Sequence, residues 1–306
     1  MTRADTTERR AGDSLAASIG DRVTDVHDRG GRRRVRVALS GIGIVTVAAG
    51  ARTVARVRQS RKVAEALRVT LEHDTLVGEG LGEPTSLIVL GDSAADGYAL
   101  ATPNDAFPWH LASHLATATS RRVRVTSFAR DGARTRHVLH EQAPLLRAID
   151  ADVIAIIVGV NDVFGRVPPA RLRADTHELV QALGEVAPAA TVVLIGCPDL
   201  GRAPGLPQPL RALVGLRCRQ ASRVQGEVAR AAGIRFVDIA AQTRAEHFGM
   251  DGLHPGRTGS LAIARGAVRA LVGDGDEPHQ DGSSDDRARD QGSRAWIWDS
   301  RGASTW

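Results

Sequence analysis

Between residues 86 and 272, short apolar runs alternate with segments long enough to form a helix. Runs that are apolar at nearly every position, separated by helices, are typical of a parallel sheet covered on both faces. Val and Ile dominate the five runs, which predict strands at 86–93, 122–129, 152–159, 191–198 and 234–240. The intervals predict helices at 105–119, 134–149, 169–187, 208–232 and 258–272. This alternation predicts one α/β domain over residues 85–272.

The segments outside this domain carry opposite charges. Residues 1–70 hold fifteen basic and seven acidic side chains, whereas residues 273–306 hold eight acidic side chains and four arginines. Both ends are polar and lack periodicity, so we predict a disordered basic arm over 1–36 and a disordered tail over 273–306. We predict a spacer or linker over 58–84, with a helical first part and a glycine-rich linker, 78–84, that ends in proline. Nucleic-acid binding calls for a basic stripe on a folded surface, often with stacking aromatics, and we therefore expect no nucleic-acid partner.

A run of fifteen uncharged residues, 37–51, follows the basic arm. A helix needs about 20 apolar residues to cross a bilayer, and arginines that reach toward the interface would extend this run to 37–57. We therefore predict a single N-terminal membrane anchor, whose orientation stays open because arginines flank both sides. Two alternatives also stay open. The run is then either the core of a signal peptide in a secreted protein or a helix of a soluble, cytoplasmic protein.

The chain has two cysteines, Cys197 and Cys218, too few for a disulfide framework or a cysteine metal site. They form either one bridge in an oxidising compartment or two unpaired buried thiols, and we favour the second. His110 and His114 have the i, i+4 spacing of a zinc-binding helix, but Leu111 stands where the metalloprotease motif requires glutamate. We expect neither a metal nor a cofactor.

Polar residues follow several predicted strands at the point where each strand ends. Ser93 closes the first strand in Gly-Asp-Ser, and Gly132 and Asn161 follow the second and third strands. Asp251 and His254 lie beyond the fifth strand, in the loop "DGLHPG". The carboxyl ends of parallel strands meet at one edge of the sheet, where open α/β folds bind their ligands. We therefore expect these five residues to lie close together.

These residue types meet the requirements of ester hydrolysis. A serine hydroxyl becomes a strong nucleophile when a neighbouring base takes its proton; His254 can be that base while Asp251 fixes its tautomer. The developing oxyanion needs hydrogen-bond donors, each worth about 3–4 kcal/mol. The Asn161 side chain can supply one, and the Gly132 N–H can supply another because no Cβ intervenes. A third is the Ser93 N–H, which we expect at the start of a helix.

The motifs "GDSAADG", "GVND" and "DGLHP", with Gly132 between the first two, resemble the four blocks of the SGNH (GDSL-type) hydrolase superfamily. The blocks occur in order, and the resemblance covers residues 86–272. The stretch from Cys197 to Arg211, "CPDLG…QPLR", further resembles a bacterial subgroup whose members carry an N-terminal hydrophobic segment. Two positions depart from the pattern. The second block reads "RDGA", which makes Gly132 the weakest match, and Ala94 replaces the usual leucine of the first block.

The resemblance implies a three-layer α/β/α sandwich of flavodoxin-like build and a shallow active site that uses no metal. It assigns Ser93 as the nucleophile, with His254 and Asp251 as the catalytic base pair. It also assigns Gly132 and Asn161, together with the Ser93 N–H, to the oxyanion hole. The sequence thus predicts an SGNH hydrolase whose catalytic residues all come from one sheet edge.

We predict a serine esterase or lipase-like acyl-hydrolase that cleaves a small-molecule, lipid or glycan ester through an acyl-Ser93 intermediate. Two alternatives use the same residues: an acyltransferase, and a non-catalytic module that binds an acyl or glycan ligand. Asp92 and Asp162 are interpreted as structural. A second Gly-Asp-Ser, at residues 12–14, follows no predicted strand, so Ser14 receives no role.

Overall fold

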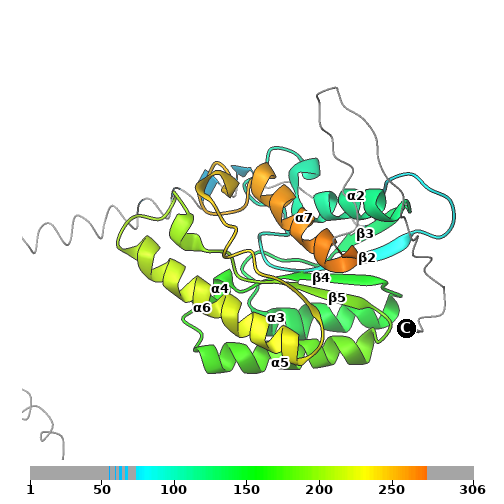
Figure 1. The fold of residues 1–306 in the computed structure, drawn as a ribbon. Helices are drawn as coiled ribbons and strands as arrows, with labels where there is room; N and C mark the ends of the chain where they lie inside the picture. Colours follow the sequence, from blue (N-terminus) through cyan, green and yellow to red (C-terminus); the bar gives the residue numbers. More distant parts are fainter. Residues whose placement is uncertain (1–54, 56–58, 60–61, 64–65, 68–73, 274–306) are drawn as a thin grey trace, which may run out of the picture.

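A computed structural model describes residues 55, 59, 62, 63, 66, 67 and 74–273 of the chain. In this part of the chain one sheet lies between two layers of helices (Figure 1). One face is covered by α2 (Phe107–Thr119) and α7 (Arg257–Val272). The other face is covered by α3 (Thr135–His137), α5 (Pro169–Val186) and α6 (Leu210–Ala231). The predicted α/β fold, with helices on both faces of a mostly parallel sheet, is confirmed.

Within the described residues the sheet has six strands in the order β1-β3-β2-β4-β5-β6. Their bounds are Thr75–Val77 (β1), Thr85–Gly91 (β2), Val123–Ser127 (β3), Val153–Ile157 (β4), Thr191–Ile195 (β5) and Arg235–Val237 (β6). Strands β2 to β6 are the five predicted ones, and their neighbours pair in parallel. The edge strand β1 was not predicted: it pairs antiparallel with β3 inside the segment interpreted as a spacer. Three residues are too few for an alternating pattern to show.

The helix predicted over 134–149 has the expected position but three different geometries. The α3 turn continues into a π-helix, η2 (Val138–Gln142), and then into a 3₁₀-helix, η3 (Ala143–Ala148). Pro144 has no N–H to donate, so residue 140 cannot receive the hydrogen bond that an α-helical ladder through this segment would need. The short helices α4 (Val160–Phe164), η1 (Pro103–Asp105), η4 (Leu200–Arg202) and η5 (Ala245–His247) lie in the loops.

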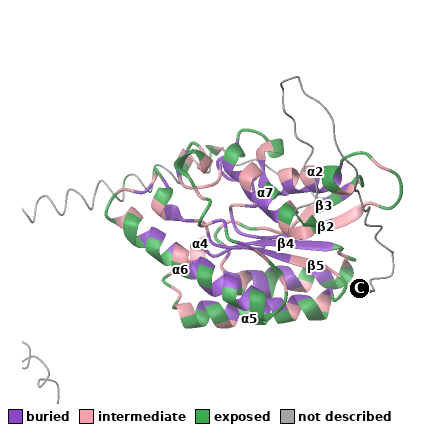
Figure 2. Cartoon of the chain, viewed as in Figure 1, coloured by how far each residue is buried: buried purple, intermediate pink, exposed green. Residues whose placement is uncertain are grey.

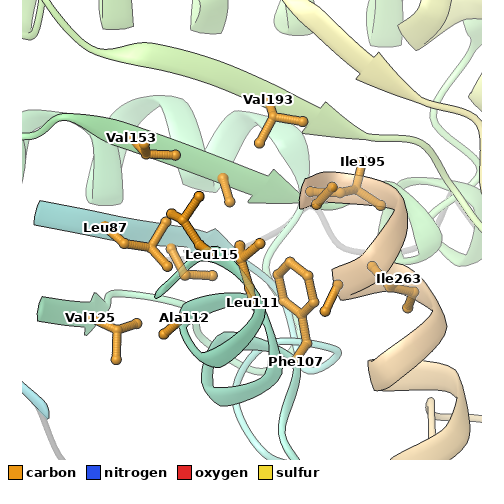
Figure 3. Packing of buried hydrophobic residues seen from close by; sticks show 14 of the residues in the cluster. Leu87, Phe107, Leu111, Ala112, Leu115, Val125, Val153, Val193, Ile195 and Ile263 are labelled. Atoms are coloured by element: carbon orange, nitrogen blue, oxygen red, sulfur yellow. The ribbon is translucent and has the colours of Figure 1, made fainter. Parts of the chain in front are cut away.

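Each face of the sheet has its own hydrophobic core, which Figure 2 shows as buried strands between the helices. In β2, Leu87 and Val89 belong to the core under α2 and α7 (Figure 3). The alternate residues Ile88 and Leu90 belong to the core under α5 and α6. Because successive side chains point to opposite faces and both faces are covered, the buried positions Leu87 to Leu90 are all apolar.

The strand order places a crevice at the carboxyl end of β2. The chain runs from β2 to β3 on one side and then crosses to β4 on the other side. Ligands in open α/β sheets bind where the strand order reverses in this way. Ser93 follows β2 and Asn161 follows β4, so both residues lie at this reversal.

The basic arm (1–36), the tail from residue 274 and nearly all of the predicted anchor (37–57) lie outside the described residues. Among the residues that are described, no helix combines the length and apolar character needed to span a bilayer. Cys197 and Cys218 are both buried, and no bridge joins them. The neighbouring Cys218 thiol and burial raise the pKa of Cys197 well above its usual value.

Candidate active site

Ser93 lies in a tight turn that begins as β2 ends. The Asp92 side chain accepts a hydrogen bond from the Ala94 N–H at 3.0 Å, and the Asp92 carbonyl accepts one from the Ala95 N–H at 3.0 Å. Both Asp92 and Ser93 are buried. The turn therefore holds the serine hydroxyl at a fixed place on the sheet edge.

The expectation that Ser93 opens a helix is wrong. Residues 93–99 form turns, and the next helix longer than one turn, α2, begins only at Phe107. Gly97 and Ala99 have positive φ values of 80° and 58°, a backbone conformation incompatible with a right-handed helix. A helix dipole therefore does not strengthen the Ser93 N–H, although the N–H remains available as a hydrogen-bond donor.

Asp251, His254 and Ser93 form one chain of hydrogen bonds, as expected. The His254 Nδ1–H donates to Asp251 Oδ2 at 2.6 Å, and the Ser93 hydroxyl donates to His254 Nε2 at 3.0 Å. The other oxygen of Asp251 accepts the N–H groups of Leu253 and His254, each at 3.0 Å. The Asp251 side chain is fully buried and that of His254 is 18% exposed. The geometry leaves the lone pair of Nε2 directed at the serine proton.

The two other predicted donors face the same cavity. Asn161, near the start of α4, donates from Nδ2 to the carbonyl oxygen of Ala133 at 3.1 Å, which orients its amide. Gly132 is exposed, has a φ of 74°, and leaves open space where a Cβ would be. Its lack of a side chain is thus required by backbone conformation and not by close approach, which corrects the reason given from the sequence. Ser93, Gly132 and Asn161 all line one cavity.

This cavity has a volume of about 420 Å³ and largely apolar walls. Its size falls within the range of small-molecule sites in proteins. The loop 198–209 contributes Pro198, Leu200 and Leu206 to the walls. Larger apolar side chains that line the remainder are Phe164, Ile239, Phe248, Leu253 and Ile263. The site therefore combines polar reactive groups with largely apolar walls.

Two buried carboxyl groups, Asp92 and Asp162, are the chain neighbours of Ser93 and Asn161. Burial raises the pKa of Asp92 to about 7, against the opposing effects of the Ala94 N–H and of the charge on His254. Burial also raises the pKa of Asp162, whose Oδ2 accepts the N–H and the hydroxyl of Thr135, each at 3.0 Å. Both carboxyl groups hold turns next to the cavity.

The ring of Tyr98 lies against the imidazole ring of His254. The two ring centroids are 5.6 Å apart and the planes are inclined by 33°. An aromatic ring packed against imidazole restricts its rotation. Within residues 74–273 no group of three or more His, Cys, Asp or Glu side chains is arranged to hold a metal ion.

The chain is similar to known proteins in sequence and in fold. Residues 89–262 match the GDSL-like Lipase/Acylhydrolase family. The chain is 34% identical to a GDSL-like esterase of Mycobacterium tuberculosis over 151 residues, which are 48% of this chain and 46% of that protein. The aligned part of the chain thus spans about half the length of that relative.

Two solved structures have a similar fold. A GDSL-like lipase from Parabacteroides merdae superposes with a TM-score of 0.51 at 16% identity, covering 67% of this chain and 99% of that one. The protein TesA superposes with a TM-score of 0.50 at 22% identity, covering 61% and 98%. At these identities the likeness establishes the fold.

Proposed function

Because this chain belongs to the GDSL-like lipase/acylhydrolase family, we propose that it is a serine esterase that cleaves carboxylic esters through an acyl-Ser93 intermediate. The observation that supports this most directly is the continuous hydrogen-bond chain from Asp251 through His254 to the Ser93 hydroxyl. A serine that touches a base, itself oriented by a buried carboxylate, is the arrangement of a nucleophilic hydrolase.

In the first half-reaction, Ser93 Oγ attacks the ester carbonyl carbon while its proton passes to His254 Nε2. The carbonyl oxygen becomes an oxyanion, which accepts hydrogen bonds from the Asn161 amide and from the N–H groups of Gly132 and Ser93. As the tetrahedral species collapses, the bond to the alkoxy oxygen breaks and His254 gives its proton to the leaving alcohol. Asp251 stabilises the imidazolium that exists between these transfers.

In the second half-reaction, water attacks the acyl carbon and gives a proton to His254. The new tetrahedral species collapses, releasing the carboxylic acid, and the proton returns to Ser93 Oγ. The apolar walls favour an ester with an apolar acyl or alcohol part, because burying apolar surface contributes about 25 cal/mol per Å². The volume of about 420 Å³ suits a substrate of small to moderate size.

The test is hydrolysis of p-nitrophenyl esters, from acetyl to dodecanoyl, by the full chain and by its Ser93→Ala variant. We expect turnover by the parent and a loss of at least about 10⁴-fold in the variant. Ser14→Ala is the matched control, because Ser14 occupies the same position in the second Gly-Asp-Ser. A Ser93→Ala protein that retains the parent rate would contradict the proposal. The chain-length profile reports how much of the acyl group the cavity accepts.

A further inference from the structure

Two buried glutamine side chains bind main-chain groups at the carboxyl ends of strands that lead into the site. Gln142 and Gln225 are 4% and 0% exposed. Gln142 comes from the π-helix η2 and Gln225 from α6, which lie in the same layer of helices. Each side chain forms hydrogen bonds with both its amide oxygen and its amide nitrogen. Burying an amide is costly unless its groups are hydrogen-bonded, and here both ends have partners.

Gln142 binds the last residue of β2, two positions before Ser93. Its Oε1 accepts the Gly91 N–H at 2.8 Å, and its Nε2 donates to the Gly91 carbonyl at 2.8 Å. Register pairing between β2 and β3 stops at Val89 and Ser127. Beyond it the Gly91 carbonyl also accepts the Arg130 N–H at 3.1 Å, whereas the Gly91 N–H has the glutamine oxygen as its partner in place of a neighbouring strand. Gly91 also lies so close to Ile157 that a Cβ would stand 2.1 Å from that carbonyl oxygen. The end of β2 is thus clamped from both sides.

Gln225 joins the ends of β4 and β5. Its Nε2 donates to the Val158 carbonyl at 2.8 Å, and its Oε1 accepts the Cys197 N–H at 2.9 Å. The next residue, Gly159, has a φ of 133°, and a Cβ there would lie 2.9 Å from Gln225 Nε2. The turn that carries Asn161 into α4 therefore runs directly over this amide.

We propose that Gln142 and Gln225 are positioning residues, Gln142 for the Ser93 turn and Gln225 for the Asn161 turn. This inference rests on the proposed function, since it assumes that Ser93 reacts and that Asn161 holds the oxyanion. Neither glutamine touches the cavity. Each glutamine instead holds a main-chain turn through hydrogen bonds made outside the cavity. This matters for the rate because a shift of about 1 Å in a reacting group can slow the reaction about 100-fold.

The readout is the second-order rate at which a fluorophosphonate probe labels Ser93 in the full chain, since phosphonylation needs the activated serine and the oxyanion donors but no knowledge of the natural substrate. We expect Gln142→Met, of similar volume without the amide, to lower this rate about tenfold or more. Gln181→Met and Gln220→Met are matched controls on exposed positions of α5 and α6 and should stay within about twofold. All rates are measured at a temperature where circular dichroism shows each variant folded.

Gln142→Glu provides the rescue. A protonated carboxyl can reproduce both bonds to Gly91, accepting with one oxygen and donating with the other, whereas a buried carboxylate repels the Gly91 carbonyl. The labelling rate of this variant relative to the parent should therefore be close to one at low pH and should fall as pH rises. A ratio that does not change with pH, or a Gln142→Met rate within twofold of the parent, would overturn the role of Gln142.

Gln225 is tested by a double-mutant cycle with Asn161. Gln225→Met should slow labelling about fivefold or more in the parent and should have little further effect in Asn161→Ala, because the amide that it positions is gone. If Gln225→Met slows labelling by the same factor in the parent and in Asn161→Ala, Gln225 has a role in folding alone and the inference is overturned. A parent chain whose Ser93 is not labelled at all would overturn the proposed function and this inference with it. If every glutamine variant is labelled as fast as the parent, only the inference is overturned.

Discussion

The two sides of the cavity are held in different ways. On the nucleophile side, Ser93, His254 and Asp251 bind one another, and two further N–H groups fix the Asp251 carboxylate. On the oxyanion side, Gly132 lies in an exposed turn, and the Asn161 amide is oriented by the Ala133 carbonyl. Both sides depend on fixed geometry, the first for proton transfer between neighbouring heavy atoms and the second for donors aimed at the developing oxyanion. Loss of the base removes the activation of Ser93 altogether, whereas loss of one of several donors removes only part of the oxyanion stabilisation.

The largest effect should follow from breaking the nucleophile side at its centre. His254→Ala removes the base that contacts Ser93, and we expect kcat to fall by about 10⁴-fold or more. Rates are measured with the best p-nitrophenyl ester. His177→Ala, an exposed position on α5, is the control and should match the parent. Residual activity within about a hundredfold of the parent would mean that another group takes the proton.

The next effect should come from the oxyanion side. Asn161→Ala removes one donor, and we expect kcat to fall about 10²- to 10³-fold, a loss of about 3–4 kcal/mol of transition-state stabilisation. The KM should change little, because the donor acts mainly on the charge that develops in the transition state. Steady-state kinetics give both constants. A loss as large as that of His254→Ala would erase the difference between the two sides, and a rise in KM alone would assign Asn161 to substrate binding.

Much of the fold could be predicted from the sequence, because the central strands β2, β4 and β5 are mostly apolar on both faces and the helices between the strands are long. The edge strand Thr75–Val77 could not, since it has one buried residue and depends on β3 for its pairing. The π-helix before Pro144 also has no periodic signature. In both cases the structure is set by contacts with other segments and not by the local pattern.

The site likewise contains residues that could be predicted from the sequence and contacts that could not. Residues that follow strand ends could be found because parallel strands bring their carboxyl ends together, and the structure brings Ser93, Asn161 and His254 to one cavity. The glutamine contacts could not be found, since Gln142 is 51 residues from Gly91 and Gln225 is 67 residues from Val158. A buried glutamine on a helix has no distinctive spacing.

Asp92 contacts both the nucleophile side and the oxyanion side of the cavity. Its titration should have a smaller effect, which falls on stability. Its Oδ1 accepts the Ala94 N–H on the Ser93 turn, and its Oδ2 is 3.5 Å from Asn161 Nδ2. Because burial raises its pKa to about 7, the folded state binds the proton more tightly than the unfolded state does. The stability that this proton contributes is fully present below about pH 4 and is lost as pH rises through 7.

Asp92→Asn cannot titrate and keeps an acceptor for Ala94. The free energy of unfolding of the parent, relative to this variant, should therefore fall by an amount on the order of 2–3 kcal/mol between pH 4.5 and pH 8. Urea unfolding at the two pH values gives this difference, and the effects of groups that do not interact with Asp92 cancel because both proteins contain them. A difference that is constant with pH would show that the Asp92 carboxyl is not buried as the structure has it.

The smallest effect should come from Gly132, the least constrained residue of the oxyanion side. A Cβ there would meet no atom within 4 Å, so Gly132→Ala should cost only the strain of a non-glycine residue at a φ of 74°, about 1–2 kcal/mol. Gly184→Ala is the matched control: it lies in equally open space within α5, where alanine should stabilise by about 0.5–1 kcal/mol. Changes of opposite sign in the free energy of unfolding, measured with urea, would show that backbone conformation determines the effect of an added Cβ.

If the Gly132 N–H also binds the oxyanion, kcat should fall with stability, because relief of the strain turns that N–H away from the cavity. A destabilised Gly132→Ala enzyme with the parent kcat would leave Asn161 and the Ser93 N–H as the donors.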